Sequence, residues 1–327
     1  MKKLNFIGNS RVIQQLGGLI DSKRFPHALI IEGEQGLGKR TLARQLAAAM
    51  VCRSEDKPCM KCSQCHKATE NIHPDIFEYS ASGGANSFHV DVVRNVINDA
   101  FLQPNEAEHK VYILGNADCM SVSAQNALLK VLEEPPSYVV FILTAVSKSS
   151  FLETVLSRSV VVTLEGVPLN DGVKYITEHF DGVTAEDAHK ALEAMGCNIG
   201  KAADALQDGK TGEITGICNE ICRALVNDNE YALLTACSFF QKDRQNIIFS
   251  MDFLKNIFRD ALVCRGSNGT VSGQLETISM LKNKLTRQKL IDLIAICDKL
   301  KEIALMNCNN SLLITKICYS LREAAGR

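Results

Sequence analysis

The sequence predicts a parallel α/β domain followed by an all-helical region, and three observations support this fold class. Short apolar runs alternate with helical patterns over residues 10–165, as in a parallel sheet with crossover helices. A glycine-rich loop at residues 33–41, GEQGLGKRT, follows the first apolar run and opens a helix. From about residue 167 onward, apolar residues recur at helical spacing and no strand pattern is visible.

The α/β region contains five predicted strands with helices between them. Ser10 can cap the first helix, because a serine hydroxyl accepts from the free N–H groups of a first turn. Pro135 and Pro136 end a later helix, since proline has no backbone donor and disfavours helix in the residue before it. In chain order, the predicted elements are a helix over Val12, Ile13, Leu16, Leu19 and Ile20, a strand at 28–31, a helix at 39–51, a strand at 75–79, a helix over Val90, Val93, Ile97 and Phe101, a strand at 111–114, a helix capped by Ser121 or Ser123 and ending at Glu134, and strands at 139–143 and 160–164.

The pattern changes near residue 166 and divides the chain. We predict an α/β P-loop domain at 1–166, a small helical domain at 167–208 and a larger helical domain at 209–327. The segment 209–212, rich in glycine and charge, reads as a linker between the two helical regions.

Composition and charge exclude several classes of protein. Of 327 residues, 46% are apolar and 22% are charged, which is typical of a soluble globular chain. The net charge of -1 gives no global basic field for nucleic acid, and no apolar run approaches the ~20 residues that span a membrane. The first residues lack the apolar stretch of a signal peptide, and thirteen cysteines without a secretion signal favour a reducing compartment. We therefore expect a cytoplasmic protein.

The loop at 33–41 matches the phosphate-binding pattern G-x-x-x-x-G-K. Its glycines let backbone N–H groups wrap phosphates, and Lys39 would reach the terminal phosphates. The next position should carry a hydroxyl that ligates magnesium, but it is Arg40, and Thr41 is turned away by about 100° along the helix. The loop therefore either binds ATP weakly or is a relic that binds no nucleotide. The candidate nucleotide-binding residues are Gly33, Gly36, Gly38, Lys39 and Thr41.

Four cysteines lie within fourteen residues, at Cys52, Cys59, Cys62 and Cys65. The two short spacings bring sulfurs within a few ångströms, and four thiolates suit a closed, structural zinc site. An iron–sulfur cluster is the chemical alternative, and a set of disulfides is disfavoured by a reducing compartment. We predict structural zinc without metal catalysis.

The order of these motifs resembles a known family. The segment NALLKVLEEPP at 126–136 follows the phosphate loop and the cysteine cluster, and it precedes Ser157, Arg158 and Ser159. This order is similar to that of the bacterial clamp-loader proteins of the AAA+ family, most closely the delta-prime family that works with DNA polymerase III. The resemblance implies a RecA-like P-loop sheet with a zinc module at 52–65, a helical lid at 167–208 and a collar-type domain at 209–327 that assembles a ring.

The chain departs from the family at the residues that hydrolyse ATP. The resemblance implies an Asp-Glu pair where this sequence has Gly115 and Asn116, and an arginine in the lid where it has Lys201. Asp118 follows too late to replace the pair, so magnesium is not expected to bind and the chain alone is not expected to hydrolyse ATP. Thr144 lies where these modules keep a polar phosphate sensor.

Two arginines take roles from the resemblance. Arg158 matches the arginine that enters the ATP site of a neighbouring subunit, and Arg94 matches a position near DNA. The implied partners are the tau/gamma motor subunits, the delta subunit, the sliding clamp and, through the complex, primer-template DNA. The function expected is a stator-like subunit that helps to load the clamp. The alternatives are a hydrolysing motor subunit of the same machine, an unrelated P-loop kinase, and a zinc-stabilised scaffold.

Overall fold

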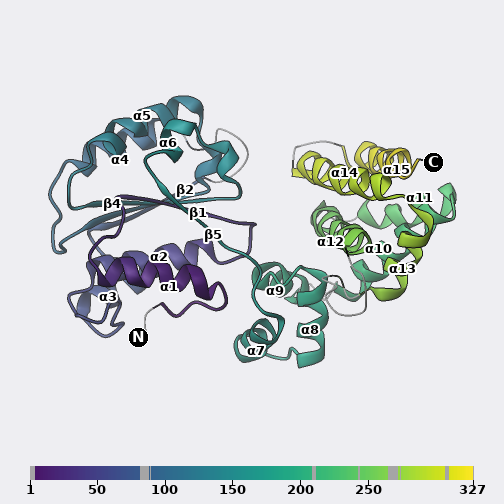
Figure 1. Cartoon of the computed structure of the whole chain (residues 1–327), viewed down its shortest axis with the longest axis horizontal. Coiled ribbons are helices and arrows are strands. Elements are labelled where there is room, and N and C mark those ends of the chain that lie inside the picture. Colours follow the sequence, from purple (N-terminus) through teal and green to yellow (C-terminus); the bar gives the residue numbers. More distant parts are fainter. Residues whose placement is uncertain are drawn as a thin grey trace. The chain divides into compact units, whose positions relative to one another are not determined.

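The computed structural model describes residues 4–81, 88, 90–207, 211–241, 244–263, 272, 274–305 and 309–326. The chain divides into two compact units, residues 1–166 and residues 167–327 (Figure 1). Each unit has its own hydrophobic core. Within the described residues, no helix is both long and apolar enough to cross a membrane.

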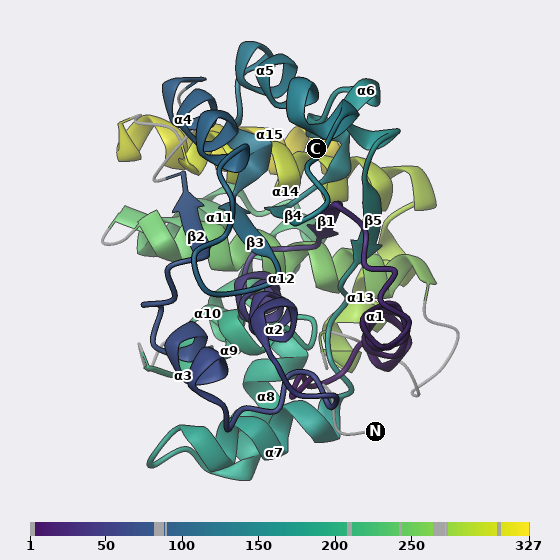
Figure 2. The same cartoon turned by 90° about the vertical axis from the view of Figure 1, so that its left-hand side faces the viewer.

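The first unit is built on five parallel strands, in the order β2-β3-β4-β1-β5 (Figure 2). Strands β3 and β4 are buried along their whole length, and β1 is buried except at its last residue, which explains why these segments read as continuous apolar runs. The five predicted strands and their parallel arrangement are confirmed. Their bounds are Ala28–Glu32 for β1, Ile76–Ser80 for β2, Lys110–Gly115 for β3, Val139–Ala145 for β4 and Val160–Thr163 for β5.

Helices cover both faces of this sheet and bury a separate core on each (Figure 1). One face carries α1 (Ser10–Asp21), α2 (Lys39–Val51) and the short α3 (Ser63–Thr69). The other face carries α4 (Val90–Ala100), α5 (Val122–Glu133) and the single turn α6 (Glu153–Leu156). The residues of the predicted nucleotide site lie at the carboxyl ends of β1, β3 and β4 and in the segments that follow them.

Two local predictions about these helices are wrong. Ser10 is the first residue of α1 and not its cap, because Asn9 takes that position in a left-handed conformation. The Asn9 side chain instead exchanges two hydrogen bonds with the backbone of Glu165, which the local pattern could not indicate. Phe101 lies beyond the end of α4 and is 56% exposed, while Val96 is buried within the helix.

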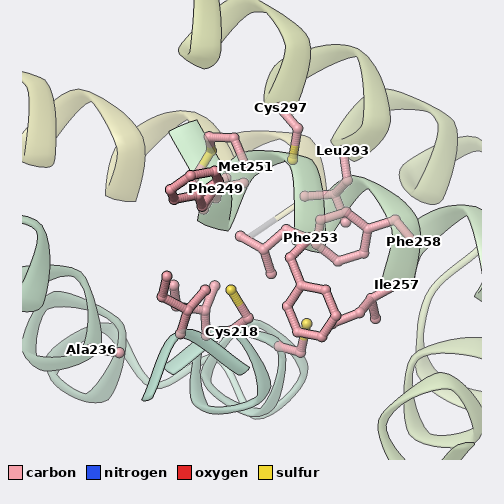
Figure 3. Close-up of a cluster of buried hydrophobic side chains, with 14 of the residues drawn as sticks. Cys218, Ala236, Phe249, Met251, Phe253, Ile257, Phe258, Leu293 and Cys297 are labelled. Carbon is pink, nitrogen blue, oxygen red and sulfur yellow. The ribbon is translucent and has the colours of Figure 1, made fainter. Parts of the chain in front are cut away.

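The second unit is helical throughout its described residues, and one core runs through it. Ala191 and Leu192, from the predicted lid, belong to the same core as residues of the predicted collar. Figure 3 shows part of it, in which Phe253, Ile257 and Phe258 pack with Leu293 and the thiols of Cys218 and Cys297. Its helices are α7 (Leu169–His179), α8 (Ala185–Ala194), α9 (Ile199–Gln207), α10 (Thr211–Val226), α11 (Glu230–Ser238), α12 (Arg244–Val263), α13 (Leu275–Lys284), α14 (Arg287–Leu305) and α15 (Asn310–Ala325). The predicted linker at 209–212 lies partly outside the described residues, and α10 begins at Thr211.

Candidate functional site

The phosphate loop connects the end of β1 to the start of α2, as the sequence pattern requires. Gly33, Gly36 and Gly38 all have positive φ angles, of 154°, 92° and 79°. A Cβ atom at Gly33 would lie 2.9 Å from the carbonyl oxygen of Leu164, so only glycine fits there. The backbone of a phosphate-binding loop is therefore preserved.

The lysine of this loop is held by the loop itself. Lys39 is the first residue of α2 and is only 8% exposed. Its ammonium donates hydrogen bonds to the carbonyl oxygens of Gly33, at 2.6 Å, and Glu34, at 2.8 Å. The ammonium is therefore bonded to backbone oxygens of the phosphate loop.

Arg40, at the position expected to hold a magnesium-ligating hydroxyl, forms an ion pair with Glu78 on β2. Glu78 also accepts from Nε of Arg44, one turn further along α2, at 2.8 Å. One carboxylate thus bridges two arginines on the same face of the helix. Thr41 is exposed beside them on the first turn of α2.

Gly115 and Asn116, which are uncharged, lie at the end of β3, where an acidic pair was expected to hold magnesium. The N–H of Asn116 donates to Oγ1 of Thr144 at 3.1 Å, so the expected sensor hydroxyl bonds to the loop after β3. A side chain at Gly115 would overlap Oγ of Ser80 on the adjacent strand. Asp118 lies past the strand end and accepts from the N–H of Val146 at 3.2 Å.

Lys201 forms a buried ion pair within the helical unit. Its Nζ lies 2.6 Å from Oδ2 of Asp252 on α12, and Lys301 on α14 lies 2.7 Å from the other oxygen. Burial opposes the charged form of Asp252, but the two lysines hold the pKa of this carboxyl below its usual value. Lys201 therefore joins α9 to the centre of the helical unit.

The four cysteines predicted as metal ligands come together at one place. Their sulfurs all lie within 4.8 Å of one another, with 4.0 Å separating Cys52 from Cys62 and Cys59 from Cys65. Zinc bound to four sulfurs at about 2.3 Å gives sulfur–sulfur edges of about 3.8 Å, so the cluster has the size of a tetrahedral zinc site. The cluster could hold a metal ion such as zinc.

The surroundings shift the pKa values of these thiols in both directions. Burial opposes ionisation of Cys62, but the N–H of Cys65 and the neighbouring thiols lower its pKa to about 6. Burial raises the pKa of the Cys65 thiol, which a metal would have to deprotonate. N–H groups also point at two sulfurs, from Cys59 to Cys52 and from Cys65 to Cys62, both at 3.4 Å.

A polar network ties this module to the sheet. The buried His73 accepts at Nδ1 from the N–H of Asp75, at 3.0 Å, so its ring proton is on Nε2 and donates to Oε1 of Gln64, at 2.7 Å. The buried carboxylate of Asp75 accepts the N–H groups of Asn105, Glu106 and Ala107 at 2.5–2.8 Å. His73 thus has a structural role in the module, and the four candidate metal ligands are all cysteines.

Arg158 lies just after α6 with its side chain 35% exposed. Its Nη1 donates to the carbonyl oxygen of Thr154 at 3.0 Å and to Oγ of Ser157 at 3.2 Å. Its Nη2 lies 3.0 Å from Oε1 of Glu133, the last residue of α5. Arg158, Ser157 and Glu133 line an open surface hollow together with Ser159, Val160 and Glu134.

Arg94 is on α4 with 65% of its side chain exposed, and it pairs with Asp91 of its own helix at 3.2 Å. Helix α4 carries none of the other candidate site residues. Sequence reasoning missed the acidic partners of the basic site residues, namely Glu78, Glu133 and Asp252. For Glu133 a signal existed, because it belongs to the LEEPP segment.

The parallel sheet, the loop between β1 and α2 and the helical unit that follows define a P-loop module of the AAA+ class. A sequence model of the family described as DNA polymerase III, delta subunit, matches residues 8–168. The DNA polymerase III subunit delta' of Haemophilus influenzae is 29% identical over 293 residues, which cover 89% of this chain and 88% of that protein. The chain is therefore similar to the clamp-loader subunits of DNA polymerase III, over residues 8–168 and over most of its length.

Two further proteins are also similar to this chain. The DNA polymerase III subunit tau of Bacillus subtilis is 26% identical over an alignment that covers 98% of this chain and 62% of that protein. Among solved structures, a DNA polymerase III gamma-subunit-related protein from Thermotoga maritima aligns over 95% of this chain and 99% of that chain, with 19% identity and a TM-score of 0.47.

Proposed function

We propose that this chain is a stator-like, delta-prime-type subunit of the replicative clamp loader, which does not hydrolyse ATP itself. It would help to load a sliding clamp onto primer-template DNA in the cytoplasm, beside tau/gamma motor subunits and a delta subunit. Zinc at Cys52, Cys59, Cys62 and Cys65 would be structural, because four sulfur ligands leave no open coordination position.

The observation that supports this function is the state of the phosphate loop. Lys39 is bonded to loop carbonyls and Arg40 is paired with Glu78, while Gly115 and Asn116 bring no negative charge for magnesium. Phosphoryl transfer needs the metal and a positioned water, and this arrangement provides for neither. Gly36 and Thr41 keep their places in the loop, so weak nucleotide binding without hydrolysis is compatible with the proposal.

Arg158 would act in the ATP site of a neighbouring subunit. Its guanidinium is at the surface and keeps donors free for a phosphate, and such arginine fingers are worth roughly 10³–10⁵ in rate at the site they serve. Arg94, exposed on α4, would lie toward DNA and contribute a phosphate contact.

The test has two parts. The purified chain alone, with magnesium, primed DNA and clamp, should show no ATP turnover above background. The reconstituted complex with Arg158→Ala should turn over ATP more slowly, while the variant keeps its folding and its zinc content. Robust turnover by the chain alone, abolished by Lys39→Ala, would favour the motor subunit or the P-loop kinase instead. Unchanged turnover with Arg158→Ala would exclude the role in trans.

A further inference from the structure

The ion pair between Arg158 and Glu133 joins two sequence motifs that are 25 residues apart in the chain. From this contact we propose that Glu133 is a positioning residue, which holds the Arg158 guanidinium in place for the phosphate of a neighbouring subunit. This inference rests on the proposed function of Arg158 in trans. It assigns to the LEEPP segment an indirect part, through Arg158, in ATP hydrolysis by the assembled complex.

Contacts that do not involve Glu133 already fix the turn that carries Arg158 to α5. Gln125 on α5 is 2% exposed and bonds the segment before α6 twice, through its Nε2 to the carbonyl of Ser150 and through its Oε1 to the N–H of Leu152. Val155 of α6 is fully buried in the core under the sheet's second face. The backbone at Arg158 is therefore rigid, and only the long side chain needs to be placed.

Three acceptors place that side chain. The carbonyl of Thr154 and the hydroxyl of Ser157 both bind Nη1 and come from the same turn, whereas Glu133 binds Nη2 from a different helix. Glu133 is thus the contact that fixes the guanidinium across the gap between α5 and α6. These contacts use three of the five N–H donors of the guanidinium, which leaves two for a phosphate while the ion pair persists.

The position of Glu133 follows from the proline pair. Because Pro135 and Pro136 cannot continue the helix, α5 ends at Glu133, and this side chain projects from the last turn beside α6. Glu134 lines the same hollow and is exposed, but its side chain makes no ion pair within the described residues. It is therefore a matched control that removes the same charge one residue away.

The experiment measures DNA- and clamp-stimulated ATP turnover by the reconstituted complex that contains Glu133→Gln, Glu134→Gln, Arg158→Ala or the double variant Glu133→Gln/Arg158→Ala. We expect Glu133→Gln to lower kcat by about two- to fivefold, the range of a partly exposed ion pair, with KM for ATP unchanged. Glu134→Gln should match the wild type. The double variant should equal Arg158→Ala, because Glu133 acts only through the arginine.

The outcomes separate the two levels of the argument. If Arg158→Ala slows turnover but Glu133→Gln does not, the positioning role is wrong and the role of Arg158 in trans stands. A rise in kcat with Glu133→Gln would mean that the glutamate restrains the arginine, which also overturns the inference. An equal loss with Glu134→Gln, or a further loss from Glu133→Gln in the Arg158→Ala background, would indicate a general charge effect and reject it. If Arg158→Ala has no effect, the proposed role of Arg158 in trans fails, and this inference fails with it.

Discussion

At the scale of single residues, basic side chains of this protein are held by acids that lie far away in the sequence. Arg40 pairs with Glu78, Arg158 pairs with Glu133 and Lys201 pairs with Asp252. The first of these contacts is at the phosphate loop and the second is at the surface hollow. The third lies inside the helical unit, where it bears on stability.

Removal of the Asp252 charge should destabilise the helical unit strongly. The carboxylate is 11% exposed and bonds Lys201 at 2.6 Å and Lys301 at 2.7 Å, so Asp252→Asn leaves a buried lysine without its counter-charge. Such losses cost about 3–5 kcal/mol. Denaturant unfolding at neutral pH would measure the cost. The partly exposed pair of Lys255 and Asp298 is the control, because Asp298→Asn should cost at most about 1 kcal/mol.

The same residue predicts a pH dependence. Because the two lysines hold the pKa of Asp252 below its ordinary value near 3.8, the carboxylate contributes stability above that value and loses it as the pH falls through the lowered pKa. The Asp252→Asn variant lacks this contribution.

These partners explain why the sequence placed the candidate residues on their elements but did not predict their contacts. The pattern at 33–41 identified the loop from local spacing, and the structure brings its residues together as expected. That Lys39 bonds to the loop carbonyls depends on how the loop closes, and the pairing of Arg40 with Glu78 spans 38 residues. No local pattern carries this information.

At the scale of elements, periodicity was sufficient for long segments and failed at their ends. The five strands and helices α1, α2, α4 and α5 were predicted with small shifts of their bounds, whereas the short α3 was not predicted. The predicted end of α4 was wrong. Phe101 continues the helical spacing in the sequence, but it lies beyond the last turn of α4 and is exposed to solvent. Helix caps and last turns are set by tertiary contacts such as the bonds from Asn9 to Glu165.

Metal removal should affect the cysteine module selectively. We expect about one zinc per chain in the purified protein, by elemental analysis. Cys62→Ser should lose the metal and lower the unfolding temperature of the sheet unit, because a structural zinc contributes its binding free energy to folding. Cys119→Ser, outside the cluster, is the control and should retain the metal. A zinc-free wild-type protein of undiminished stability would contradict the assignment.

The docking of this module should weaken in mild acid. Burial lowers the pKa of His73 because it disfavours the charged ring, and the neutral ring accepts the N–H of Asp75 at Nδ1. A depressed histidine pKa contributes stability above the ordinary value of about 6.5, and this contribution is lost as the pH falls from there toward the lowered pKa. The free energy of unfolding of His73→Asn, measured from pH 7.5 to 5.5, should therefore fall less than that of the wild type. Parallel curves would show that His73 does not titrate as inferred.

At the scale of the whole molecule, two units with separate cores should unfold as separate transitions. Residues 1–166 bury two cores on the sheet, and residues 167–327 bury one helical core. In calorimetry, chelation of zinc should lower the transition of the sheet unit, and Asp252→Asn should lower that of the helical unit. A single transition that both perturbations shift equally would instead show that the two units unfold cooperatively.

The phosphate loop that binds its own lysine has a consequence for a living cell. A subunit that does not hydrolyse ATP, as we propose for this chain, would keep its shape when the ratio of ATP to ADP rises or falls. Its conformation would then be insensitive to metabolic state, while motors beside it would cycle with every nucleotide. Such a subunit can provide the constant frame of reference against which their movements are converted into work.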